Sequence, residues 1–193
     1  MATAPSKAIG AFVLIVAALI LASCGGDGGA ASSSSPFAWL RPTSLPTGWS
    51  AARLPTGTAT IAYPPHWRRI TGDPGTVSAA LVGADDQIVG YLNATPRQAN
   101  ETLSNWATFR PNHNAHEGDH HVHTLAATRT VPFRSGHASC VIDTYRTIRT
   151  AYREIACLVV RDRNATVIVA ASTTAAWPRH YRQLERAVQA FRT

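Results

Sequence analysis

Short stretches in which apolar and polar residues alternate recur along the chain between turn-forming residues such as Pro, Gly and Asp. Alternation predicts β-strands, because successive side chains of a strand point to opposite faces of a sheet. In the first half of the chain the pattern predicts strands at residues 58–63, 77–82 and 88–94. Upstream of them, residues 37–53 are interrupted by prolines and predict an extended lead-in that packs its tryptophans onto the core.

Apolar residues three and four positions apart predict two helices. The first has a clear start signal, because Thr95, Pro96 and Gln98 suit the N-cap, N1 and N3 positions of a capping box. Pro111 should end this helix. The second predicted helix covers residues 178–191 and should lie on a sheet through its apolar stripe.

Four further alternating segments lie between these helices and are joined by short connections. They are residues 122–133, 137–148, 151–161 and 165–172. Consecutive strands with such short links must run antiparallel as a meander. The order of strands, helix, meander and helix predicts an α+β, two-layer domain with helices packed on an antiparallel sheet.

Composition agrees with one folded domain or two very small ones, and it excludes several chemistries. The chain has 193 residues, of which 45% are hydrophobic, and Lys7 is its single lysine. If Lys7 is removed with a signal sequence, the mature chain has no lysine. Schiff-base, pyridoxal-phosphate and P-loop chemistry are then excluded, because each needs that amine.

The first 36 residues have the layout of a secretion signal followed by a linker. Lys7 precedes an apolar run at residues 9–21, and small residues follow that run. The run is about 13 residues long, shorter than the roughly 20 that cross a bilayer as a helix. Residues 25–36 are rich in Gly and Ser and predict a flexible tether.

Residues 21–24 read Leu-Ala-Ser-Cys and resemble the lipobox of bacterial lipoproteins. In that family the chain is cut before the cysteine, which then carries a thioether-linked diacylglycerol. The resemblance implies a signal peptide at residues 1–23, a palmitate-bearing lipidated Cys24 with its tether at 24–36, and a single domain at 37–193. It implies a location at the extracytoplasmic face of the cell membrane, where two acyl chains suffice for stable anchoring.

Loss of Lys7 changes the formal net charge from +7 to +6. The predicted compartment excludes nucleic acid as a partner, and the lipid anchor makes the membrane the first partner. An envelope protein, a lipid or a wall polymer could contact the arginines. Alternatively, the arginines are spread over a solvated surface, because no basic run is longer than Arg68-Arg69.

The folded part also resembles a known sandwich. The string Tyr-Pro-Pro-His-Trp at residues 63–67, a mid-chain helix, a meander ending Val-Ile-Val-Ala-Ala-Ser-Thr at 167–173 and an amphipathic terminal helix carry the resemblance. Together they resemble the PsbP-like α/β/α sandwich, a group that includes LpqN-type actinobacterial lipoproteins. The resemblance spans about residues 48–193. It implies a non-catalytic binding or accessory role, and it brings no functional residues to this chain.

Cys140 and Cys157 remain once Cys24 is assigned to the lipid, and an even pair outside the cytoplasm predicts a disulfide. A hairpin centred between residues 148 and 149 places the two cysteines directly opposite each other, within disulfide reach. The closed loop of about 17 residues should stabilise the fold by about 3 kcal/mol. No Cys-x-x-Cys motif favours a redox role.

The same register places Asp143 opposite Glu154, and Tyr145 opposite Tyr152, on the other face of the hairpin. Directly opposed like charges destabilise a strand pair unless a cation lies between them. Arg146, Arg153 or an arginine from another element could supply that cation. The alternative is a paired-carboxylate site for acid/base chemistry or metal binding.

Five histidines lie within eleven residues, together with two carboxylates: His113, His116, His120, His121 and His123. Imidazoles and carboxylates are ligands that Zn, Cu and Ni prefer. His121 and His123 would share one face of a strand, and the first two histidines one side of a helix end. A Zn or Cu site is therefore one prediction, and a solvated, pH-sensitive loop is the other.

Residues 116–120 read His-Glu-Gly-Asp-His, which are the letters of a zinc peptidase motif. That motif binds zinc only where a helix places both histidines on one face. Gly118 and the strand predicted after it disfavour such a helix. The sequence therefore predicts a lipid-anchored, extracytoplasmic binding module with no cofactor and no catalysis of its own. A metal-binding envelope protein is the alternative, and a metallopeptidase is the third interpretation.

Overall fold

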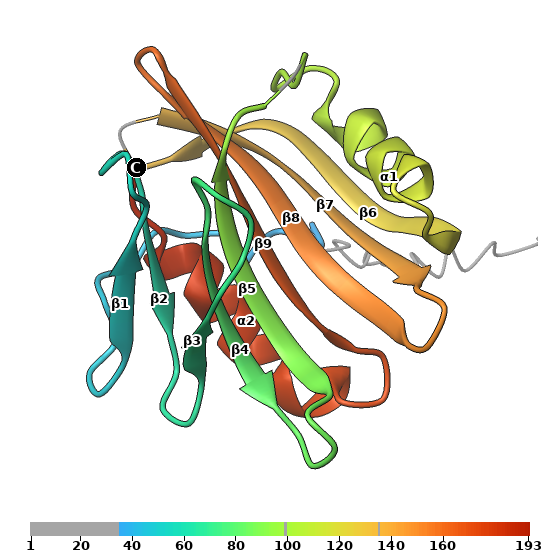
Figure 1. Cartoon of the computed structure of the whole chain (residues 1–193). Helices are drawn as coiled ribbons and strands as arrows, with labels where there is room; N and C mark the ends of the chain where they lie inside the picture. The colour runs from blue at the N-terminus through green and yellow to red at the C-terminus, as the bar shows by residue number, and fades with distance from the viewer. Residues whose placement is uncertain (1–34, 99, 135) are drawn as a thin grey trace, which may run out of the picture. The chain divides into compact units, whose positions relative to one another are not determined.

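Seven strands form one antiparallel sheet in the computed structural model of the chain, which describes residues 35–98, 100–134 and 136–193 (Figure 1). In order across the sheet they are β3 (Arg68–Ile70), β4 (Val77–Val82), β5 (Ile88–Pro96), β9 (Asn164–Thr173), β8 (Ala151–Arg161), β7 (Gly136–Arg146) and β6 (His120–Phe133). The predicted meander is confirmed, because β6 to β9 pair in succession with antiparallel register. β5 pairs with β9, which joins the strands before and after the mid-chain helix into one sheet.

The register of β7 and β8 is the predicted one. Cys140 pairs with Cys157, and Asp143 pairs with Glu154. A disulfide joins the two cysteines, as predicted. The cysteines and the carboxylates occupy positions of opposite parity, so they lie on opposite faces of the sheet.

The terminal helix α2 (Trp177–Ala190) covers the cysteine face of the sheet. Its Leu184 and Val188 are fully buried in the main core, together with the disulfide and residues of β4, β5, β8 and β9. A separate two-stranded sheet of β1 (Ser50–Arg53) and β2 (Thr60–Tyr63) also packs against α2. The lead-in predicted as extended throughout therefore contains a strand, which pairs with the strand predicted at residues 58–63.

The mid-chain helix α1 (Trp106–His116) differs from the prediction at both ends. Thr95 and Pro96 do not begin a helix. They extend β5 and pair with Val167 and Thr166 of β9, because a central strand position provides ladder hydrogen bonds that an isolated cap does not. Pro111 does not end α1 but lies inside it.

Side chains between the two elements satisfy the backbone groups that the expected cap would have bound. The backbone N–H of Gln98 donates to Glu101 Oε2 at 3.1 Å. Thr102 and Asn105 then bond reciprocally, each backbone N–H donating to the other side chain, just before α1 begins. The helix tolerates Pro111 because tertiary contacts hold it; the indole N–H of Trp106, for example, donates to the carbonyl of Ala156 in β8 at 2.9 Å.

α1 packs on the face of the sheet opposite α2, over β6, β7 and β8 (Figure 1). A second, smaller core forms there from Trp106 and apolar residues of β7, β8 and β9. The expected two layers are therefore three: helix, sheet and helix. This arrangement agrees with the α/β/α sandwich that the resemblance implied.

Among the described residues, no helix is long and apolar enough to cross a membrane. The described chain from residue 35 onwards belongs to one compact unit. The signal peptide, the lipobox and Cys24 lie outside the described residues, so lipidation remains a prediction.

Candidate functional site

A buried ion pair lies between α1 and the sheet. Arg110 of α1 bonds Glu154 of β8 in bidentate fashion, with Nε donating to Oε1 at 2.7 Å and one Nη to Oε2 at 2.9 Å. Asn114, one helical turn further along α1, donates its side-chain N–H to Oε1 at 3.3 Å. The cation expected beside the opposed carboxylates is thus an arginine from another element.

Asp143 is the carboxyl group of this buried cluster that Arg110 does not bond. It is fully buried opposite Glu154, and neither of its carboxylate oxygens has a hydrogen-bond partner among the described residues. Burial first, and the charge of Glu154 second, raise the pKa of Asp143 to about 8, although Arg110 acts in the opposite direction. One guanidinium therefore serves two carboxyl groups, and the one it does not bond holds its proton near neutral pH.

Neighbouring groups respond to the same surroundings. Burial and the charge of Glu154 raise the pKa of Tyr145 and, at the edge of the cluster, that of Asp119. Burial acts to lower the pKa of Arg110, but the charge and hydrogen bonds of Glu154 outweigh it and the pKa is raised. Arg110 therefore stays charged.

A cleft of about 210 Å³ opens beside this cluster, between α1 and the strands that α1 leaves uncovered. Its lining comes from α1, from β5, β7 and β9, and from the segments before β4 and α1. The lining side chains are Asp73, Thr76, Tyr91, Asn93, Thr95, Gln98, Glu101, Trp106, Phe109, Arg110, His113, Tyr145, Val167 and Val169. Arg110 and Tyr145 belong to both the cleft and the buried cluster.

The floor of the cleft is a row of linked polar side chains. Asn93 of β5 donates to the hydroxyl of Ser78 in β4 at 2.9 Å, and Thr95 donates to the side-chain oxygen of Asn93 at 2.7 Å. The hydroxyls of Ser78 and Tyr91 lie 3.3 Å apart. These bonds hold the polar groups in place on rigid strands, which is the preorganisation that a binding site needs.

One wall of the cleft is aromatic. Phe109 stacks between Trp106 and His113 along one side of α1, with ring centroids 6.1 and 5.9 Å apart. Trp106 is buried, whereas Phe109 and His113 are partly exposed. The cleft therefore offers a ring face on one side and hydrogen-bonding groups on the other.

Arg110 also has donors left for the cleft. Its Nε and one Nη bond Glu154, and a guanidinium carries five N–H groups. The second Nη bonds no atom among the described residues, and neither does the hydroxyl of Tyr145. A ligand oxygen entering the cleft can accept from these groups.

A second hollow of about 660 Å³ lies where the β4–β5, α1–β6 and β7–β8 turns meet. It is larger but more open, and its acidic rim includes Asp85, Asp86, Glu117 and Asp119. One described side-chain hydrogen bond links its turns, between Gln87 and Thr150 at 2.8 Å. The smaller cleft is the better candidate, because its lining is fixed by strand pairing and buried bonds.

The five histidines do not come together. His113 stacks on Phe109 in the cleft wall, and His116 is the exposed last residue of α1. His120, His121 and His123 are exposed on β6, where His121 has a φ of 53°. Within the described part of the chain, no group of three or more His, Cys, Asp or Glu side chains is arranged to hold a metal ion.

The His-Glu-Gly-Asp-His string does not lie on a helix. α1 ends at His116, and Gly118 adopts a φ of 95°, which only glycine adopts readily. The backbone N–H of Asp119 then returns to the carbonyl of Asn114 at 3.0 Å. The helical geometry that a zinc peptidase requires is therefore not formed here.

Sequence reasoning missed most of the cleft. Trp106 and Arg110 have the helical spacing that predicts this helix, and Asn114, four residues further along, continues the same face of α1. The expected helix, however, began at Pro96, after a cap at Thr95, which is ten residues before α1 begins. The strand face of Tyr91 and Asn93 carried no recognisable motif.

Comparison with known proteins supports the fold. No protein-family model and no curated protein sequence matches the chain. Among solved structures, cyanobacterial PsbP (CyanoP) from Synechocystis sp. PCC 6803 is similar with a TM-score of 0.55 and 13% identity, over 90% of this chain and 98% of that one. LpqN of Mycobacterium tuberculosis, described as involved in cell envelope biogenesis, has a TM-score of 0.43 and 9% identity over 78% and 88% of the two chains. The likeness to cyanobacterial PsbP concerns the fold alone: this chain is an α+β protein with a PsbP-like arrangement of two helices on an antiparallel sheet.

Proposed function

We propose that this protein is a lipoprotein anchored through Cys24 to the extracytoplasmic face of the cell membrane. In this proposal it is a non-catalytic binding or accessory module of the cell envelope, and the cleft beside α1 is its ligand site. The observation that carries the binding role is a cleft whose polar floor is held by hydrogen bonds, whose aromatic wall is held by ring stacking and whose charged end is held by an ion pair.

The size and chemistry of the cleft suggest what enters it. Its volume of about 210 Å³ is below the roughly 300 Å³ at which pockets begin to enclose drug-sized ligands. The cleft therefore takes one ring or one short side chain of a ligand, with oxygen atoms toward Arg110 and Tyr145. The preorganised polar groups favour a neutral, hydroxyl-bearing group over an apolar one.

Anchoring is tested by growing cells that express the chain with labelled palmitate. The wild-type protein should take up label and sediment with membranes, and Cys24→Ser should do neither. The matched control is Cys140→Ala/Cys157→Ala, which removes two cysteines but should keep the label. Equal labelling of wild type and Cys24→Ser would contradict lipid anchoring.

Ligand binding is tested by recording backbone amide spectra of the domain during titration with monosaccharides, amino acids and nucleosides. Binding in the cleft should shift the signals of residues around Tyr91 and Phe109. Asn93→Ala should weaken the effect about tenfold, because the floor loses its central hydrogen-bonding group. Exposed Thr174→Ala is the control and should bind as wild type. Shifts confined to the larger hollow at the turns would disprove the assignment.

A further inference from the structure

The outer face of α2 carries a row of arginines. Arg179, Arg182 and Arg186 are three and four residues apart, which places them on one stripe of the helix. All three are exposed, and none forms an ion pair within the described residues. We call these three residues the α2 arginine stripe.

The stripe is only partly balanced by acids on its own helix. Arg182 and Arg186 are four residues apart, a like-charge spacing that destabilises a helix. Glu185, the single acidic residue of α2, lies three residues from Arg182; burial raises the pKa of Glu185, and the charge of Arg182 acts against that rise. One acid against three arginines leaves an excess of positive charge on an exposed helix face, which suits a partner of opposite charge outside the molecule.

Further arginines surround α2. Arg134 donates to the carbonyls of Gln189 and Phe191 at the C-terminal end of the helix, and Arg192 follows directly. Arg41 is exposed on the lead-in, which the backbone N–H of Thr43 ties to the carbonyl of Gln189. The described acidic residues other than Glu185 lie in turns at the ends of the sheet or on the side of α1. We call α2 together with the adjoining Arg41, Arg134 and Arg192 the α2 layer; its exposed surface is positively charged.

The start of the described chain relates this layer to the proposed anchor. Phe37 and Leu40 are buried in the core that α2 covers, so the chain leaves the domain beside α2. Ten residues separate Cys24 from Ser35 in the sequence. A lipid on Cys24 would therefore attach the domain on the side where the described chain begins, beside α2.

We propose that the α2 arginine stripe is a membrane-contact surface that binds the phosphates of anionic lipid headgroups. Guanidinium groups bond phosphate oxygens in pairs, and basic residues near an anionic leaflet each strengthen attachment about fivefold. Because α1 and α2 cover opposite faces of the sheet, this contact directs the cleft away from the membrane. The proposal rests on the membrane location proposed above and adds a second, non-covalent attachment to it.

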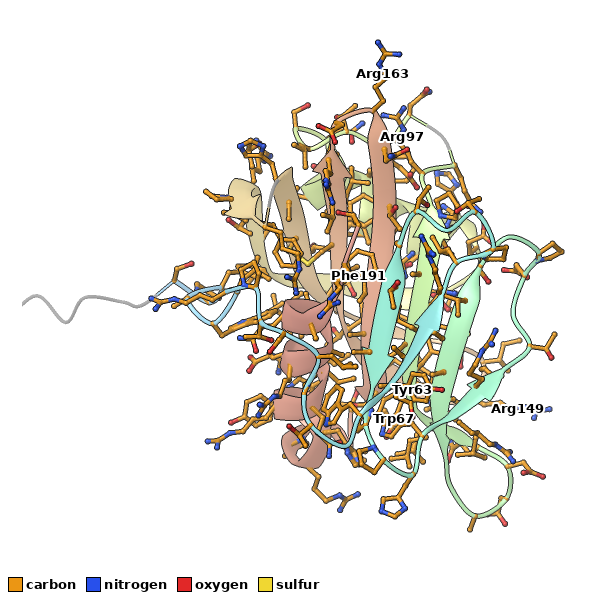
Figure 2. All side chains as sticks on the ribbon, turned by 90° about the vertical axis from the view of Figure 1, so that its left-hand side faces the viewer. Tyr63, Trp67, Arg97, Arg149, Arg163 and Phe191 are labelled. Carbon is orange, nitrogen blue, oxygen red and sulfur yellow. A yellow bond between two sulfur atoms is a disulfide. The ribbon has the colours of Figure 1, made fainter. Side chains whose placement is uncertain are left out.

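The test uses the domain from residue 34 to 193 without a lipid, because this compact unit holds both cores. Its sedimentation is measured with vesicles of phosphatidylcholine alone and of phosphatidylcholine mixed with phosphatidylglycerol. The matched control for R179Q/R182Q/R186Q is R97Q/R149Q/R163Q, which removes the same charge elsewhere. Figure 2 shows Arg97 and Arg163 at one end of the sheet and Arg149 near the other, away from the helix that ends at Phe191.

We expect the wild-type domain to bind the vesicles that contain phosphatidylglycerol and not those of phosphatidylcholine alone. Added salt should weaken this binding. R179Q/R182Q/R186Q should bind about a hundredfold more weakly, whereas R97Q/R149Q/R163Q should bind nearly as wild type. The charge-preserving R179K/R182K/R186K should fall between the two, because ammonium groups keep the charge but cannot bond phosphate oxygens in pairs. Circular dichroism confirms that each variant is folded.

Equal loss in both glutamine variants would overturn the proposal, because net charge and not the stripe would then drive attachment. Absence of vesicle binding by wild type would also overturn it. Binding to dextran sulfate but not to vesicles would overturn it in favour of an anionic polymer. Since the domain carries no lipid, these results are independent of whether Cys24 is labelled by palmitate.

Discussion

Under α1, one buried guanidinium group faces two buried carboxyl groups. Arg110 bonds Glu154 through two of its donors and leaves Asp143, fully buried, without a partner among the described residues. A buried carboxyl group without a counterion keeps its proton, because the charged form is poorly solvated there. The cluster therefore forms a charged, hydrogen-bonded end of the cleft.

The pH dependence of stability should follow from Asp143. The pKa of its carboxyl is about 8 in the folded protein, against an ordinary value of 3.8. Between these values the folded protein holds the proton more tightly than the unfolded chain, so this contribution to stability falls as pH rises. Asp143→Asn should be more stable than wild type above about pH 8, by on the order of 2 kcal/mol.

Urea unfolding across the pH range measures this difference. The advantage of Asp143→Asn should disappear below about pH 3, where wild-type Asp143 is protonated in both states. Asp162→Asn, at an exposed turn, is the control and should show no such slope. A pH-independent difference between Asp143→Asn and wild type would show that the pKa of Asp143 is the same in the folded and unfolded chains, and would contradict the raised pKa.

Removing Arg110 should damage the fold more than removing an exposed arginine. Arg110→Leu leaves Glu154 buried without its cation, a loss that typically destabilises by about 3–5 kcal/mol. Arg110→Lys should recover only part of it, because an ammonium group cannot form the bidentate pair. Arg146→Gln, on the exposed end of β7, should change unfolding free energy by less than about 0.5 kcal/mol. Thermal unfolding measures the stability of the three variants. Equal losses of stability for Arg110→Leu and Arg146→Gln would contradict the buried ion pair.

At the scale of elements, the hairpin of β7 and β8 organises both faces of the sheet. Its register brings the cysteines together under α2 and the carboxylates together under α1. α1 is held on this hairpin by Trp106 and Arg110 and not by its own start signal. The position of a helix with such weak local signals depends on its contacts with the sheet.

The disulfide should account for a measurable share of stability. Cys140→Ala/Cys157→Ala should lower the free energy of unfolding by about 3 kcal/mol, because the cross-link restricts the unfolded chain. Reductant should produce a similar loss in wild type and none in the double variant. Alkylation of two thiols in the native, unreduced protein would contradict the disulfide.

At the scale of the whole molecule, the two faces of the sandwich have different surfaces. The α2 layer is basic and lies where the described chain begins, whereas the cleft lies on the side of α1. A domain attached through its α2 layer would present the cleft to soluble or wall-bound partners. Attachment and recognition would then not compete for the same surface.

This division predicts a pattern of arginine reactivity. On vesicles that contain phosphatidylglycerol, Arg179, Arg182 and Arg186 should react with phenylglyoxal several-fold more slowly than in solution, because headgroups cover them. Arg97 and Arg163 should react at the same rate in both conditions. Mass spectrometry of the modified peptides measures both sets, and uniform protection would contradict a defined orientation.

Local pattern alone determined much of this protein. The four meander strands, the terminal helix and the register that joins Cys140 to Cys157 were predicted, because alternation and short connections are properties of neighbouring residues. The mid-chain helix was placed too early, since Thr95 and Pro96 suit a cap locally but gain more by pairing with β9. The local signal favours the cap, and the strand that outcompetes it lies far along the chain.

Only the tertiary structure decided what the site is. It separated the five histidines that are neighbours in the sequence, and it brought Arg110 to a carboxylate 44 residues away. Opposed Asp143 and Glu154 could be predicted to need a cation, but its identity depends on which helix face meets the sheet. Burial, which makes one carboxyl group keep its proton and fixes the lining of the cleft, exists only once distant segments have packed together.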